Sequence, residues 1–234
     1  MMKFLFMLFL MNNAWASEKK IWQDHFVPTL KKSIDKTGLI ILGSGITSSV
    51  VVHELDKKIN YYNDDHPILF DEKSSDQLGR AGNGVMGISI AVTQLFFDKD
   101  NGIRHAQALI LTTLSHASIA GLVRRNRPEN NTNFLPFPAS YPSGHAASAF
   151  ATAGSLAYSY GPKAGVPAYA AATAISLSRI RSNRHWASDI VGGAFLGTFW
   201  ARASSESAAD KKDSVLLVPA PVYDGIMITA IKDF

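Results

Sequence analysis

Two residues near the end of the chain have the types and spacing needed for nucleophilic chemistry. His185 and Asp189 lie four positions apart, so on a helix they would share one face. A carboxylate that accepts the Nδ1–H of an imidazole fixes its tautomer and leaves Nε2 free as a nucleophile or base. The same spacing also occurs in purely structural His–Asp hydrogen bonds, so this pair alone does not decide the function.

A second segment could supply a general acid and a binding site for an anion. Residues 141–145 read Tyr-Pro-Ser-Gly-His and precede an Ala-rich run, which places Ser143 near a helix N-cap. The free N–H groups of a helix N-terminus bind anions, and Gly144 allows the backbone to approach closely. His145 would lie in the same site and could protonate a leaving oxygen. The alternative is an ordinary helix cap with a surface histidine.

Several arginines complete the set of residues suited to phosphate chemistry. Arg124, Arg125 and Arg127 lie in the run Arg-Arg-Asn-Arg-Pro, and Arg179 precedes His185 by six residues. Guanidinium groups hold phosphate oxygens through planar pairs of N–H donors. Solvated arginines at helix ends are the alternative for any one of them.

The order of these motifs is more specific than any one of them. Arg-Pro at 127–128 is followed by Pro-Ser-Gly-His at 142–145 and by Ser-Arg-x5-His-x3-Asp at 178–189. This arrangement resembles the type 2 phosphatidic acid phosphatase superfamily, which also contains bacterial class A acid phosphatases and vanadium haloperoxidases. The resemblance covers about residues 80–202, with the second and third motifs matched in full.

The resemblance implies a helical bundle and a role for each matched position. His185 would be the nucleophile that forms a phosphohistidine, oriented by Asp189, and His145 would be the general acid for the leaving group. The phosphate oxygens would be held by a further group of residues: Arg127, Arg179, Ser143 and the backbone N–H of Gly144.

One position departs from the pattern of the family. The lysine that normally stands seven residues before the arginine of Arg-Pro is replaced by Ala120. Loss of one such cation could cost about 2–4 kcal/mol of transition-state stabilisation. Arg124 lies four residues later on the same helical face and is our candidate substitute, with Arg125 less direct. A weakly active or non-catalytic phosphate-binding protein is the alternative.

These observations predict a phosphatase that needs no metal and no other cofactor. The substrate would be a phosphorylated lipid, a lipid pyrophosphate or a small phosphate ester. A vanadate-dependent haloperoxidase could use the same residues, although those enzymes are generally much longer than 234 residues. The chain has no cysteine, which excludes thiolate catalysis and thiolate-bound metals. The remaining histidines show no metal-ligand spacing with carboxylates, and we interpret His116 as a packed core residue.

The net charge of +4 is mild, and the basic residues form no nucleic-acid groove.

Long apolar stretches predict an all-α bundle of about six helices. They cover residues 38–53, 82–97, 103–123, 144–160, 164–180 and 186–202. Residues 56–75 read as a polar loop with at most a short helix. Two β-prone runs after residue 214 suggest a small C-terminal hairpin.

The N-terminus has the features of a secretory signal peptide. Lys3 precedes a short apolar run, and Ala14-Trp15-Ala16 places small residues at the positions that signal peptidase reads. We therefore expect a signal peptide over 1–16, a single domain over 17–234 and an exported, periplasmic protein. Polar residues interrupt the apolar stretches, which favours a soluble or membrane-bound peripheral bundle over an integral membrane protein.

Overall fold

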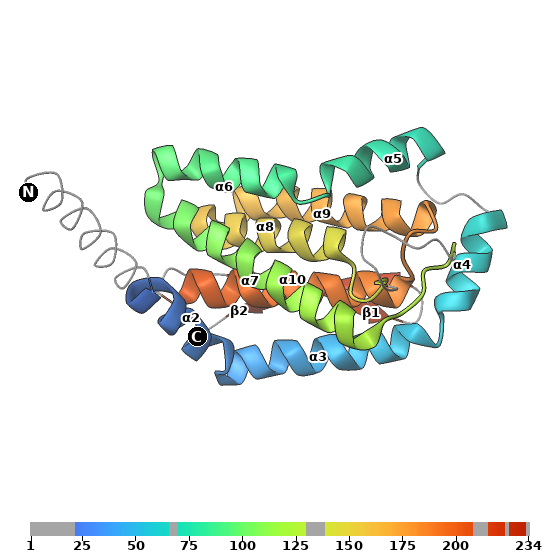
Figure 1. The fold of residues 1–234 in the computed structure, drawn as a ribbon, viewed down its shortest axis with the longest axis horizontal. Helices are drawn as coiled ribbons and strands as arrows, with labels where there is room; N and C mark the ends of the chain where they lie inside the picture. The colour runs from blue at the N-terminus through green and yellow to red at the C-terminus, as the bar shows by residue number, and fades with distance from the viewer. Residues whose placement is uncertain (1–21, 66–69, 130–138, 208–214, 223–224, 233–234) are drawn as a thin grey trace, which may run out of the picture.

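The fold is a bundle of long helices that run along a common direction (Figure 1). The computed structural model describes residues 22–65, 70–129, 139–207, 215–222 and 225–232. Its elements are a π-helix η1 (Trp22–Phe26), α2 (Val27–Ser33), α3 (Lys36–His53), α4 (Asp56–Asp65), α5 (Glu72–Ala81), α6 (Val85–Phe97), α7 (Lys99–Val123), α8 (Gly144–Tyr160), α9 (Pro162–Arg181), α10 (Ala187–Glu206), β1 (Val215–Val222) and β2 (Gly225–Lys232).

The predicted all-α class is confirmed, but the bundle contains more helices than the six expected. The region expected to be mainly a loop forms α4 and the first part of α5 instead. Acidic residues begin these two short polar helices. Asp56 is the first residue of α4, and the side chain of Asp71 caps α5 by accepting the Ser74 N–H at 2.6 Å. Apolar periodicity alone misses helices of this kind.

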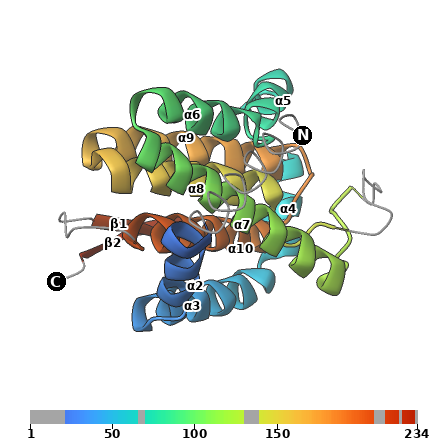
Figure 2. The same cartoon turned by 60° about the vertical axis from the view of Figure 1, so that its left-hand side comes forward.

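The central element is α10, which is buried along almost its whole length. It packs against α8 on one side and against α3 on the other, and it also contacts α7 and α2. The view in Figure 2 shows the same layering, with α9 and α6 beyond α8. Close approach depends on glycine, because a Cβ at Gly197 would lie 2.1 Å from the Ala147 carbonyl oxygen.

Four helix ends meet at one end of the bundle. The N-termini of α8 and α10 lie there with the C-termini of α7 and α9 (Figure 1). Two backbone hydrogen bonds join the connecting segments: the Ser140 N–H donates to the Arg125 carbonyl and the Ser143 N–H to the Asp189 carbonyl, both at 2.9 Å. The three motifs suited to phosphate chemistry therefore meet at this end.

The opposite end of the bundle is held by an ionic cluster. The guanidinium of Arg202, only 2% exposed, contacts both carboxylate oxygens of Asp35 at 2.9 Å and Glu206 at 2.8 Å. Lys32 pairs with the same two acids. Because Asp35 also caps α3 by accepting the Gly38 N–H, this cluster fixes the start of α3 against the end of α10.

Large apolar side chains cover much of the outer surface of three helices. Among the described residues, α3 and α7 are long and apolar enough, by length and composition, to cross a membrane. On α6, Phe96 and Phe97 are 81% and 86% exposed. The exposed apolar residues of these three helices are together called the apolar surface. They are Leu39, Ile40, Ile46, Val50 and Val51 of α3, Val85, Met86, Ile88, Val92, Leu95, Phe96 and Phe97 of α6, and Ile110, Leu114, Leu122 and Val123 of α7.

At the C-terminus, β1 and β2 pair antiparallel, with Val215 opposite Lys232 and Val222 opposite Gly225. The predicted signal peptide over residues 1–16 lies outside the described residues.

Replacing Gly197 with alanine should destabilise the bundle. The added methyl would overlap the backbone of α8, and overpacking of this kind costs about 1–3 kcal/mol. The matched control is Gly43→Ala, since a Cβ at Gly43 in α3 meets no atom within 4 Å. We expect the Tm of the purified protein to fall for Gly197→Ala and not for the control; equal Tm values would contradict this account of the α8–α10 contact.

Candidate active site

His185 is held by its backbone surroundings as well as by Asp189. It lies just before α10, whose N-cap is Trp186, so the pair does not share a helical face as the spacing predicted. The Nδ1–H donates to the Ser140 carbonyl at 2.9 Å, and Nδ1 lies 3.6 Å from Oδ2 of Asp189. The tautomer is therefore fixed mainly by a carbonyl oxygen, with the carboxylate next to it, and Nε2 remains available for chemistry.

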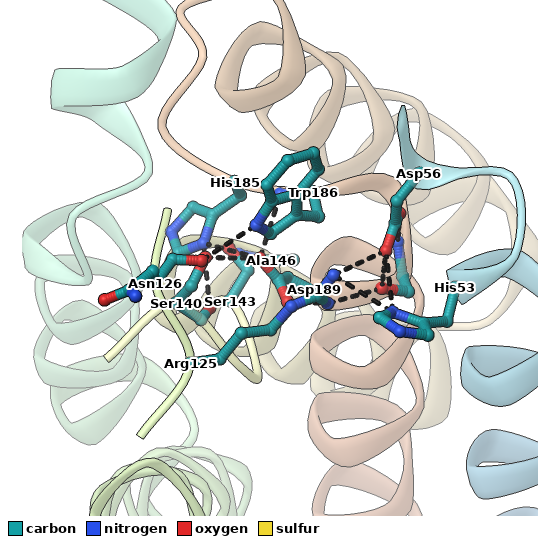
Figure 3. Close-up of polar contacts among 11 residues, drawn as sticks. His53, Asp56, Arg125, Asn126, Ser140, Ser143, Ala146, His185, Trp186 and Asp189 are labelled. Carbon is teal, nitrogen blue, oxygen red and sulfur yellow. Dashed lines mark hydrogen bonds and ion pairs between the residues drawn. The ribbon is translucent and has the colours of Figure 1, made fainter. Parts of the chain in front are cut away.

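Asp189 is fully buried and accepts hydrogen bonds from three directions (Figure 3). Its Oδ2 accepts from the Ser140 hydroxyl and from the Trp186 N–H, the latter at 2.9 Å. Its Oδ1 accepts from Nη1 of Arg125 at 2.8 Å. These donors compensate for the removal of the buried carboxylate from water.

His145 faces His185 across the site. It lies in the first turn of α8, and its ring centroid is 6.4 Å from that of His185, with the two rings tilted by 57°. Ser143 caps this helix: its fully buried hydroxyl accepts the Ala146 N–H at 3.4 Å. The two imidazoles therefore lie close enough to act on one bound substrate.

Arg127 and Arg179 supply positive charge to the same space. Both act electrostatically on His145 and on His185. Within the described part of the chain, the buried Nε atoms of these two arginines have no hydrogen-bond partner. A buried donor without a partner is costly, so these guanidinium groups are suited to receive the oxygens of a bound oxyanion.

Burial lowers the pKa of His185 below its ordinary value. Hydrogen bonding and the charge of Asp189 oppose this shift, whereas Arg127 and Arg179 add to it. The imidazole is therefore neutral, and so nucleophilic, at a lower pH than a histidine in water.

Ala120, at the position of the missing lysine, is fully buried in α7 and carries no charge. The predicted substitute, Arg124, caps α7 and donates through Nε to the Gly121 carbonyl at 3.0 Å. A further cation lies beside the site: the charge of Arg184 acts on both Arg127 and Arg179, while its Nη1 pairs with Glu129 at 2.8 Å.

Sequence reasoning missed several residues of the site. Ser140 contributes both a carbonyl acceptor and a hydroxyl donor, yet it lies outside the recognised Pro-Ser-Gly-His segment. His116, interpreted as a core residue, lies against the start of α8, where a Cβ at Gly144 would come within 3.1 Å of its Nε2. Arg125 was named as a less direct candidate for phosphate, and the structure instead pairs it with two carboxylates, Asp189 and Asp56.

Helix α5 closes the site over Arg179. A Cβ at Gly79 would lie 2.1 Å from Nη1 of Arg179, and one at Gly82 would lie 3.4 Å from Cδ2 of His145. These glycines therefore leave space for the functional side chains. Among the described residues, no group of three or more His, Cys, Asp or Glu side chains is arranged to hold a metal ion.

Comparison with known proteins identifies the family of this site. Residues 101–213 match the model of the PAP2 superfamily. The resemblance to this superfamily that the motifs predicted is therefore confirmed over this segment. The chain is 48% identical to the lipid A 1-phosphatase of Porphyromonas gingivalis over 61 residues. These aligned residues make up 25% of this chain and only 14% of that protein.

Two solved structures share the PAP2 fold of this chain. LpxE of Aquifex aeolicus matches with a TM-score of 0.56 and 23% identity, over 65% of this chain and 93% of that one. A transmembrane PAP2-type phosphatidylglycerolphosphate phosphatase of Bacillus subtilis matches with a TM-score of 0.59 and 15% identity, over 74% and 98%. At these identities the likeness supports the fold alone.

Substituting Gly79 with alanine should weaken anion binding without unfolding the protein. The added methyl would displace the end of a flexible side chain, the Arg179 guanidinium, rather than backbone. Because a hydrogen bond to a charged group contributes about 1.5–3 kcal/mol, we expect the Kd for inorganic phosphate to rise about 10-fold or more. Calorimetric titration of Gly79→Ala beside Gly43→Ala measures this; equal Kd values would exclude the proposed contact.

Proposed function

We propose that this chain is a metal-independent phosphatase that acts through a phosphohistidine intermediate on phosphorylated lipids. The observation that carries the proposal is the arrangement of His185, backed by Ser140 and Asp189, opposite His145 and beside Arg127 and Arg179. These are the groups needed to attack phosphorus, to hold its oxygens and to protonate a leaving group.

In the first step, Nε2 of His185 attacks phosphorus and the bond to the leaving oxygen breaks. His145 donates a proton to that oxygen, so the alcohol or phosphate leaves with its departing oxygen protonated. Asp189 stabilises the positive charge that His185 gains on bonding, because it lies 3.6 Å from Nδ1. Arg127 and Arg179 offset the negative charge that develops on the phosphoryl oxygens.

In the second step, water attacks the phosphohistidine. His145, now unprotonated, accepts a proton from this water, and the bond between phosphorus and Nε2 breaks to release inorganic phosphate. Both histidines return to their starting states. No oxidant, reductant or metal enters the balance.

A lipid substrate is favoured by the surroundings of the site. The lipid A 1-phosphatase relative is named for a phosphorylated lipid, as is the phosphatase of similar fold from Bacillus subtilis. The apolar surface of α3, α6 and α7 would be unusual on a soluble protein. We therefore propose that these helices face a lipid bilayer, the alternative that the sequence favoured less, and that export places the site in the periplasm.

Removal of the nucleophile should abolish phosphate release. We expect wild-type protein to release phosphate from at least one of p-nitrophenyl phosphate, phosphatidic acid, undecaprenyl pyrophosphate or lipid A, and His185→Ala to lose at least about 1,000-fold in kcat. The control is His25→Ala in η1, next to α2 and therefore at the far end of the bundle. Absence of phosphate release from the whole panel by folded wild type would contradict the phosphatase assignment.

Membrane integration is tested by extraction. If the apolar surface contacts lipid, the full chain should stay in the membrane pellet after an alkaline carbonate wash and should enter solution only with detergent. Release by carbonate would instead indicate peripheral binding, the arrangement first expected from the interrupted apolar stretches.

A further inference from the structure

A second carboxylate, Asp56, lies behind the catalytic pair and comes from outside the segment that matches the family. It is the first residue of α4 and is 3% exposed. Its Oδ1 accepts the Ser188 N–H at 2.9 Å and its Oδ2 accepts the Ser188 hydroxyl at 2.6 Å. Asp56 and Ser188 are 132 residues apart in sequence, so this contact depends on tertiary packing. Burying a charge is costly unless it is paired, so the two contacts with Ser188 are not enough to compensate for it.

Arg125 links this carboxylate to Asp189. Its Nη1 donates to Asp189 at 2.8 Å and its Nη2 to Asp56 at 2.7 Å, so one guanidinium is shared by two buried acids (Figure 3). Nη1 also donates to the Ser188 hydroxyl at 2.7 Å. The guanidinium carbon lies 5.3 Å from the centre of the Trp186 ring, which limits its movement.

We propose that Asp56 is a positioning residue that sets, through Arg125, how strongly Asp189 acts on His185. This inference rests on the phosphatase mechanism proposed above. A guanidinium bound to Asp189 alone would neutralise most of the charge that must stabilise the His185 cation. Because Asp56 shares the guanidinium, the group of two acids and one base keeps a net charge of −1 facing the imidazole.

The outermost contact of this group is His53. Its Nδ1 lies 3.2 Å from Oδ2 of Asp56 and 3.1 Å from Nη2 of Arg125, and its side chain is 59% exposed. The group thus connects the end of α3 and the start of α4 to the catalytic loop. Segments before residue 101, outside the family match, therefore complete the site.

The sign of the effect can be derived from the charges that face His185. These charged or titratable groups are Asp189 from α10, Arg127 after α7, Arg179 from α9, His145 from α8 and His116 from α7. Arg125 acts on them through its contact with Asp189. Loss of the Asp56 charge leaves Arg125 to Asp189 alone, which weakens the attraction for the imidazolium, so the pKa of His185 falls. Loss of the Arg125 charge does the opposite, and the pKa rises.

The test compares pH profiles of kcat/KM for variants that remove one charge each. For Asp56→Asn we expect kcat to fall at least about 10-fold with KM within about 3-fold, and the acidic limb to move to lower pH. For Arg125→Gln we expect the acidic limb to move to higher pH. One substrate is used throughout, so its own ionisation is common to all profiles.

The matched control is Glu54→Gln, which removes the same charge two residues away from an exposed side chain. It should leave kcat and the acidic limb unchanged, which separates the contact from a long-range effect of net charge. If wild type hydrolyses the substrate but the limb of Asp56→Asn does not move, the inference fails while the phosphatase function stands. If Asp56→Asn does not fold, an unmoved limb in Arg125→Gln overturns the inference equally, whereas an inactive wild type would refute the function itself.

Discussion

The hydrogen bonding of the buried Asp189 carboxylate is the constraint on which the rest of the site depends. A charge with no exposure to water must be surrounded by donors, and those donors come from the segment after α7, the segment before α8 and the N-terminus of α10. Satisfying one carboxylate therefore fixes three connections at once. Arg127, His145 and His185 lie in or next to the same connections, so the hydrogen bonds that Asp189 requires also bring these three residues together.

The site is arranged for an anion that completes its charge balance. Arg127 and Arg179 act electrostatically on both histidines, and the nearby Arg184 acts on these two arginines. The two acids behind His185 are already paired with Arg125. Repulsion among these cations is relieved when a phosphate enters. Arg184 also offers a partial replacement for the missing lysine, because a cationic side chain beside the site keeps the local potential positive although Ala120 carries no charge.

The sequence was sufficient to predict the helical class and to group residues that the structure brings together at one end of the bundle. His145, His185, Arg127 and Arg179 could be grouped because their spacing follows a family pattern, and their helices follow from long apolar stretches. Asp56 and Gly79 could not be found in this way, because α4 and α5 are short and polar and reach the site only through tertiary packing. Likewise, helical spacing favoured Arg124 over Arg125, because the contact of Arg125 with Asp189 forms after α7 has ended at Arg124 and depends on tertiary packing.

The packing of α10 explains how one short chain can combine an ionic end with apolar sides. Gly193 and Gly197 bring α10 so close to α8 that backbone meets backbone, and the interior needs few large side chains to fill it. Large apolar residues are then left to the outer faces of α3, α6 and α7. A substrate with a phosphate head and hydrocarbon chains matches both parts of this surface: its head requires the cationic end, and its chains can remain in lipid beside the outer helices. The division between a polar end and apolar sides thus follows from the same glycines that bring the catalytic loops together.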